Sequence, residues 1–159
     1  MHDGHLKLAS FAQSELNLDR VIFVPSFETP LKDKKTLMSA TQRLKLVKQA
    51  VKQNPRFFVS DYEIKKKGVS YTVDTLKYFK KKFGAGTTLY FLSGADTLKN
   101  IFRWKSLDEV LRLCCFVVVS RPGYRLTKKL PEAILLPMDA LDVSSTEIRG
   151  GLSSNRIKK

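Results

Sequence analysis

Histidine, cysteine and tryptophan are scarce in this chain, and its apolar runs are short. The 159 residues include two histidines, two cysteines and one tryptophan. The longest apolar runs, such as Cys114 to Val119, fall well below the roughly 20 residues of a membrane-spanning helix. The polar start of the sequence does not match a secretory signal peptide either. We therefore expect a cytoplasmic protein with no membrane partner.

The two cysteines, Cys114 and Cys115, are adjacent within an apolar run. Neighbouring residues of a strand point to opposite faces, so the pair predicts two reduced core side chains rather than a disulfide. A zinc site is also disfavoured. Two histidines need at least one further protein ligand, and adjacent cysteines lack a chelating spacing. We expect no metal-ligating residues.

Acidic residues are few relative to basic ones, with 15 Asp and Glu against 29 Lys and Arg and a net charge of +14. Such a field attracts nucleic acids or phosphorylated metabolites. The lysine runs at 65–67 and 80–82 do not alternate with aromatic residues, unlike a nucleic-acid platform. We interpret them as solvated surfaces and expect no nucleic-acid partner. The charge favours a protein that handles phosphates, without identifying its ligand.

The pattern of short apolar runs predicts one α/β domain over residues 1–159. Hydrophobic residues make up 43% of the chain, which is ordinary for a globular protein. Strands alternating with helices indicate a parallel sheet with right-handed crossovers. The expected strands, which lack polar alternation, are 21–24, 57–59, 89–92, 116–119 and 134–136. The expected helices are 5–16, 42–53, 73–83 and 107–113, the last with a capping box of Ser106 and Glu109.

The two histidines, His2 and His5, lie three residues apart with Gly4 between them. If a helix starts here, both imidazoles lie on one side of its first turn. A helix N-terminus offers free N–H groups, and imidazoles there could add donors to the charge that develops in phosphoryl or nucleotidyl transfer. The alternative is an incidental, frayed chain end, and the spacing leaves both interpretations open.

A second polar cluster lies near the other end of the sequence. Ser144 with Glu147 forms a capping box, which predicts a helix beginning near Ser145. The functional interpretation adds the hydroxyl of Ser145 or Thr146 and the guanidinium of Arg149 around an oxyanion, because arginine binds phosphate bidentately. Simple helix initiation and phosphate binding both remain open.

Further candidates lie between these clusters. Gly94 and Asp96 follow a predicted strand, and ligands gather beyond the carboxyl ends of parallel strands. Asp96 could hold ribose hydroxyls there, while Gly94 permits close backbone approach. Tyr71 and Thr72 lie at a predicted helix start. Trp104 is either a core residue or a platform for a ring.

Together these segments closely resemble the bacterial nicotinate mononucleotide adenylyltransferases, within the wider nucleotidyltransferases that share an H-x-G-H motif. H-x-G-H is weak by itself, but the ordered set covers nearly the whole chain. The resemblance implies a Rossmann-like, doubly wound parallel sheet of the nucleotidyltransferase type. The segments that carry it are HDGHL (2–6), DRVIFVP (19–25), SYTVDTL (70–76), GAD (94–96), RPGY (121–124) and SSTEIR (144–149).

The resemblance implies that nicotinate mononucleotide attacks the α-phosphate of ATP in NAD biosynthesis, giving the dinucleotide and pyrophosphate, with Mg²⁺ assisting. His2 and His5 would then stabilise the α-phosphate as the catalytic residues. No side-chain nucleophile is required, because positioning and charge neutralisation suffice. By the same resemblance, ATP would be bound by Gly4, Gly94, Asp96, Ser145, Thr146 and Arg149, and the pyridine nucleotide by Lys32, Tyr71, Thr72, Trp104 and Arg121.

The chain also departs from the family pattern. A Pro-Pro-His-Lys type turn is replaced by Thr-Pro-Leu-Lys at 29–32, so Leu31 cannot donate to phosphate and Lys32 would act without it. The family's opening strand and glycine-rich loop do not precede His2, so we expect the sheet to lack its first, central strand. The family's C-terminal tail is missing beyond Arg156, so we expect truncation at both ends.

Two alternatives follow from these departures. One is a sister adenylyltransferase, for instance one acting on phosphopantetheine, although Trp104 and the Ser-Tyr-Thr segment at 70–72 argue against it. The other is a catalytically impaired remnant that binds polyanions. The sequence leaves open the oligomeric state and how strictly nicotinate is preferred over nicotinamide.

Overall fold

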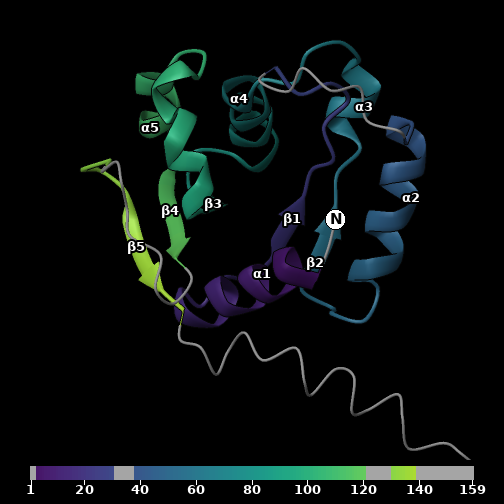
Figure 1. Ribbon diagram of the computed structural model, residues 1–159, viewed down its shortest axis with the longest axis horizontal. Helices are drawn as coiled ribbons and strands as arrows, with labels where there is room; N and C mark the ends of the chain where they lie inside the picture. Colours follow the sequence, from purple (N-terminus) through teal and green to yellow (C-terminus); the bar gives the residue numbers. More distant parts are fainter. Residues whose placement is uncertain (1–2, 31–37, 121–129, 139–159) are drawn as a thin grey trace, which may run out of the picture.

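The computed structural model describes residues 3–30, 38–120 and 130–138. Parallel strands alternate with helices, which confirms the α/β class and the expected strands to within two residues at each end (Figure 1). No helix within these ranges is long and apolar enough to cross a membrane. In chain order the elements are α1 (Asp3–Glu15), β1 (Val21–Phe23), α2 (Ala40–Val51), β2 (Phe57–Val59), α3 (Tyr62–Lys66), α4 (Thr72–Phe83), β3 (Tyr90–Gly94), the 3-10 helix η1 (Ala95–Arg103), α5 (Leu107–Leu113), β4 (Cys115–Ser120) and β5 (Ile134–Pro137).

Local sequence explains where α2 begins and which face it buries. The Ser39 hydroxyl accepts the N–H of Gln42 at 3.2 Å, and the Gln42 side chain accepts the N–H of Ser39 at 2.8 Å. This reciprocal cap satisfies two donors that a helix start otherwise leaves unpaired. Val47 and Val51, four residues apart, share a buried cluster with Phe57 of β2.

The expected capping box at Ser106 is wrong, although α5 does begin at the next residue. Ser106 adopts a left-handed backbone conformation (φ 52°, ψ 51°), and its side chain makes no capping hydrogen bond. The backbone carbonyl of Ser106 accepts the N–H of Glu109 at 3.0 Å instead. The Ser–Glu spacing therefore predicted the start of the helix correctly but predicted the wrong capping interaction.

The strands form two separate parallel sheets. In the first, β1 pairs with β2 and Ile22 lies opposite Phe58; in the second, the order is β3-β4-β5 and Leu92 lies opposite Val117. Strands β1 and β3 face each other across the middle of the molecule (Figure 1), and no strand of the described ranges pairs with both. The gap falls where the resemblance predicts a central strand.

Helix α1 packs against both sheets. Ala9 belongs to a buried cluster with Val21 and Phe57 of the first sheet. Ala12, with no exposed surface, packs with Val117 of the second sheet. Such small side chains let the helix backbone come close to both sheets, so α1 covers the gap between β1 and β3 from one side.

The two cysteines are free thiols, as expected, and both are half-buried. Cys114 follows α5 and donates from its thiol to the carbonyl oxygen of Val110 at 3.2 Å. Burial raises the pKa of Cys114 to about 11, so its thiol stays neutral near pH 7. Cys115 is the first residue of β4.

Candidate active site

A cavity of about 1210 Å³ lies between β1 and β3. Its walls come from α1, both facing strands, one face of α4 along its whole length, and the end of η1 with the segment that follows it. Of the residues predicted from the sequence, the structure brings together His5, Tyr71, Thr72, Gly94 and Trp104 as lining residues of this one cavity.

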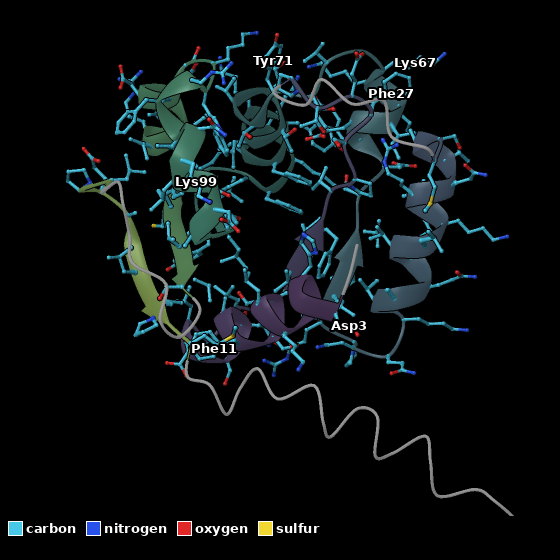
Figure 2. The ribbon with its side chains drawn as sticks, viewed as in Figure 1. Asp3, Phe11, Phe27, Lys67, Tyr71 and Lys99 are labelled. Carbon is cyan, nitrogen blue, oxygen red and sulfur yellow. The ribbon has the colours of Figure 1, made fainter. Side chains whose placement is uncertain are left out.

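The loop after β1 positions the segment that leads into α4. The Arg43 guanidinium donates to the carbonyl oxygens of Ser26 at 2.7 Å and Phe27 at 2.9 Å. The N–H of Phe27 donates to the Ser70 hydroxyl at 3.0 Å, and the N–H of Ser70 donates to the carbonyl of Glu28 at 2.9 Å. These bonds fix the residue that precedes Tyr71. Figure 2 shows Phe27 and Tyr71 at the same end of the molecule.

A buried polar pair forms part of the cavity wall below this segment. The Thr75 hydroxyl donates to Glu63 Oε1 at 2.6 Å. Thr75 is 8% and Glu63 is 9% exposed, so little water reaches the bond. A buried carboxylate requires such a partner because desolvating it unpaired is costly. The pair ties α3 to α4 and stiffens the part of the wall next to Thr72.

Trp104 packs in the core and also lines the cavity. Its ring lies edge-on to the core rings of Phe91 and Phe116, with centroids 5.4 and 5.9 Å apart. It also lines the cavity and is half-buried. Aromatic packing therefore holds a surface of the indole at the cavity wall, where a planar ligand ring could stack.

Two basic residues beside Trp104 also line the cavity, and sequence reasoning missed them. Arg103 and Lys105 flank the tryptophan, and Lys105 Nζ lies 4.4 Å from the ring centroid of Tyr71. The available signal was the pair of cations on either side of the chain's single tryptophan. Their position makes this end of the cavity electropositive.

His5 lies on the first turn of α1 and lines the cavity with an exposed side chain. Gly4 precedes it in α1 and is not among the lining residues. At Gly94, the last residue of β3, an added Cβ would lie 3.9 Å from Leu8 of α1, which is ordinary contact. Leu8, in the second turn of α1, therefore lies near the carboxyl end of β3.

Asp96 lies at that edge but does not line the cavity. Its carboxylate pairs with Lys99 at 3.1 Å and is 80% exposed. The other predicted site residues lie outside the described residues. These are His2, Lys32, Arg121, Ser145, Thr146 and Arg149, together with the helix predicted near Ser145.

Comparison with known proteins assigns the family. A cytidylyltransferase-like family model matches residues 1–151. A probable nicotinate-nucleotide adenylyltransferase of Clostridium novyi is 44% identical over 99% of this chain and 82% of its own length. Its counterpart in Thermoanaerobacter sp. is 40% identical over 98% of this chain and 79% of its own length. The chain belongs to the nicotinate-nucleotide adenylyltransferase family.

Solved structures confirm the fold of this adenylyltransferase. Plasmodium falciparum nicotinic acid mononucleotide adenylyltransferase complexed with NaAD superimposes with a TM-score of 0.60 at 18% identity. The match covers 82% of this chain and 68% of the Plasmodium chain. The Rossmann-like nucleotidyltransferase fold predicted from the motifs is thereby confirmed.

Proposed function

We propose that this adenylyltransferase transfers the adenylyl group of ATP to nicotinate mononucleotide, giving nicotinate adenine dinucleotide and pyrophosphate in NAD biosynthesis. The observation that carries the proposal is the convergence of His5, Gly94, Tyr71, Thr72 and Trp104 on one cavity. Its relatives at 36–44% identity bear the name of this activity. One structural neighbour is described as complexed with NaAD and another with APC.

The reaction needs no covalent intermediate on the protein. A phosphate oxygen of the mononucleotide attacks the α-phosphorus of ATP, a new P–O bond forms, and the bond to the β-phosphate oxygen breaks to release pyrophosphate. His5 would donate to the α-phosphate oxygens, where negative charge develops. The resemblance assigns the same role to His2 and the grip on the ATP phosphates to Ser145, Thr146 and Arg149.

The acceptor end of the cavity suits a pyridine ring. Trp104 offers an aromatic surface, and Tyr71 and Thr72 lie at the start of α4. Unpaired N–H groups at a helix start favour a carboxylate. Asp96 would serve the adenosine ribose only if its side chain turned away from Lys99, and Lys32 and Arg121 remain predictions from the resemblance.

The proposed reaction also requires Mg²⁺. Mg²⁺ would travel with the ATP phosphates, as it does where dedicated protein cages are absent. The described residues contain no group of three His, Cys, Asp or Glu that could hold a metal ion, so no described residue is assigned to it.

The free thiols of Cys114 and Cys115 support a reducing compartment and hence the cytoplasm. We propose small-molecule substrates as the partners, and no nucleic acid.

A panel of acceptors tests the reaction. Pyrophosphate release from ATP is measured with nicotinate mononucleotide, nicotinamide mononucleotide and phosphopantetheine, one at a time. We expect the highest specificity constant for nicotinate mononucleotide. Release with phosphopantetheine only would replace the proposed acceptor, and no release with any acceptor, together with binding of polyanions, would favour a non-catalytic role.

A further inference from the structure

We propose that Lys105 selects the acid form of the pyridine nucleotide over the amide form, by placing its ammonium beside the ring carboxylate. The inference rests on the proposed function and deepens it by naming a specificity-determining residue. Lys105 lies outside the motifs that link the chain to its family, and it enters the argument only through its position in the cavity.

The backbone around Lys105 directs its side chain to the cavity. Trp104 closes η1, and its indole is held by Phe91 and Phe116. Ser106 follows in the left-handed region at φ 52°, a conformation that non-glycine residues adopt at an energetic cost. Lys105 lies between the anchored ring of Trp104 and the tight turn at Ser106, so the position of its backbone is well fixed.

The Tyr71 ring holds the ammonium at the acceptor end of the cavity. Lys105 Nζ lies 4.4 Å from the centroid of Tyr71, within the range of a cation–π contact. Tyr71 and Trp104 both line the cavity beside it. Lys105 is exposed and Tyr71 is half-buried, so the contact with the ring, rather than burial, keeps the ammonium beside the cavity.

The charge of Lys105 is not neutralised by an ion pair within the described ranges. The pKa of Asp74 is lowered chiefly by a hydrogen bond from Lys66, and the charge of Lys105 lowers it only in smaller part. Asp74 already accepts from Lys66. Lys105 therefore remains able to pair with an anion that enters the cavity.

The two candidate acceptors differ at one group. Nicotinate mononucleotide carries a ring carboxylate with a full negative charge, whereas nicotinamide mononucleotide carries a neutral carboxamide. A fixed ammonium attracts the carboxylate, while the amide can offer only its carbonyl oxygen and places an NH₂ group in the same positive field. Lys105 should therefore raise the preference for the acid without setting the rate of chemistry.

The test uses Lys105→Met, which removes the charge and keeps a linear, flexible side chain one atom shorter. Specificity constants are measured for both mononucleotides, and their ratio is compared with that of the wild type. We expect the acid-to-amide ratio to fall about tenfold, equivalent to about 1.4 kcal/mol, almost wholly through nicotinate mononucleotide. A ratio taken on one preparation is independent of its active fraction. Lys105→Arg retains the charge and should keep most of the preference.

Lys82→Met is the matched control. Lys82 Nζ also lies over aromatic rings, 5.8 Å from Tyr78 and 5.7 Å from Phe83, but Lys82 does not line the cavity. The acid-to-amide ratio of specificity constants of Lys82→Met should stay at the wild-type value. Calorimetric titration of each mononucleotide without ATP gives a second readout, in which Lys105→Met should weaken binding of the acid about tenfold and leave the amide unchanged.

The outcomes separate the two proposals. A wild-type protein that turns over nicotinate mononucleotide while Lys105→Met keeps the wild-type ratio and affinity overturns the role of Lys105 and leaves the proposed function standing. Equal losses for acid and amide overturn it too, because they would indicate a structural role. A wild type that neither binds nor turns over either mononucleotide overturns both proposals.

Discussion

His5 stands on the first turn of α1, where helix N–H groups lack intrahelical acceptors. An imidazole added to these donors can follow the charge that builds on an α-phosphate. Losing one such donor typically costs on the order of 3 kcal/mol, or about a hundredfold in rate. We therefore expect His5→Ala to reduce the turnover number about a hundredfold in a steady-state pyrophosphate assay, with an unchanged circular dichroism spectrum.

Ser10→Ala provides the control for this substitution. Ser10 is exposed on the same helix and does not line the cavity. Its turnover should match the wild type within twofold. An equally small effect of His5→Ala would show that His5 takes no part in the reaction.

For single residues, the sequence predicted which side chains belong to the site better than it predicted the contacts that they make. The motifs identified His5, Tyr71, Thr72, Gly94 and Trp104, all of which line the one cavity between the two sheets. They did not identify Lys105, whose relevance arises only where the turn at Ser106 brings it over Tyr71. Asp96 was placed at the end of β3 as expected, but the sequence interpretation did not consider its i,i+3 pairing with Lys99.

Helices α3 and α4 are joined by the bond between Thr75 and Glu63. Thr75→Val keeps the shape of the side chain and leaves a buried carboxylate without its donor. We expect the free energy of unfolding to fall by about 1–3 kcal/mol in urea titrations, the usual penalty for an unsatisfied buried group. The bond joins two elements, so its loss should also loosen the wall next to Thr72.

Thr87→Val serves as the comparison. The Thr87 hydroxyl donates to the carbonyl of Phe83 at 3.1 Å, at the half-buried end of α4. Water can replace this bond, so the loss should be smaller than for Thr75→Val. Equal losses for the two variants would mean that Glu63 does not depend on Thr75.

Helices and strands were predicted correctly where the apolar residues followed a single clear periodicity. The apolar run at 57–59 and the helical repeat ending at Phe83 match β2 and α4 closely. Helix α3 was missed because its five residues span little more than one turn, and η1 because its 3-10 geometry repeats every three residues. Boundaries elsewhere shifted by one or two residues, as helix ends usually do.

The whole molecule is divided by the gap between β1 and β3. Each of these strands pairs on one side only within the described residues, and the cavity lies between them. An edge strand presents unpaired N–H and C=O groups that favour association with other chains. The cost is roughly 1–3 kcal/mol for each buried unpaired group, against a total stability of about 5–15 kcal/mol. We therefore expect residues 1–159 to aggregate readily and to turn over slowly.

Filling the gap tests this expectation. A strand of five valine and isoleucine residues with a two-glycine turn, fused ahead of Met1, should pair with both edges. We expect a higher midpoint of thermal unfolding, a monodisperse elution profile and faster turnover than in the unfused chain. A serine-rich extension of equal length is the control. Cooperative unfolding and full turnover of residues 1–159 without any extension would show that the gap needs no strand.

Helix α1 carries a mechanical consequence of this architecture. Its two small contact residues, Ala9 and Ala12, belong to different hydrophobic clusters, one in each half of the molecule. Larger side chains of the same helix also pack on these clusters, Leu6 on the first and Leu8 and Phe11 on the second, so α1 interlocks with both halves and cannot slide freely against either. Any hinge movement between the halves would pass through this helix. His5 lies one turn before Ala9, so such a movement would carry its imidazole toward or away from Gly94 and make α1 the lever of the site.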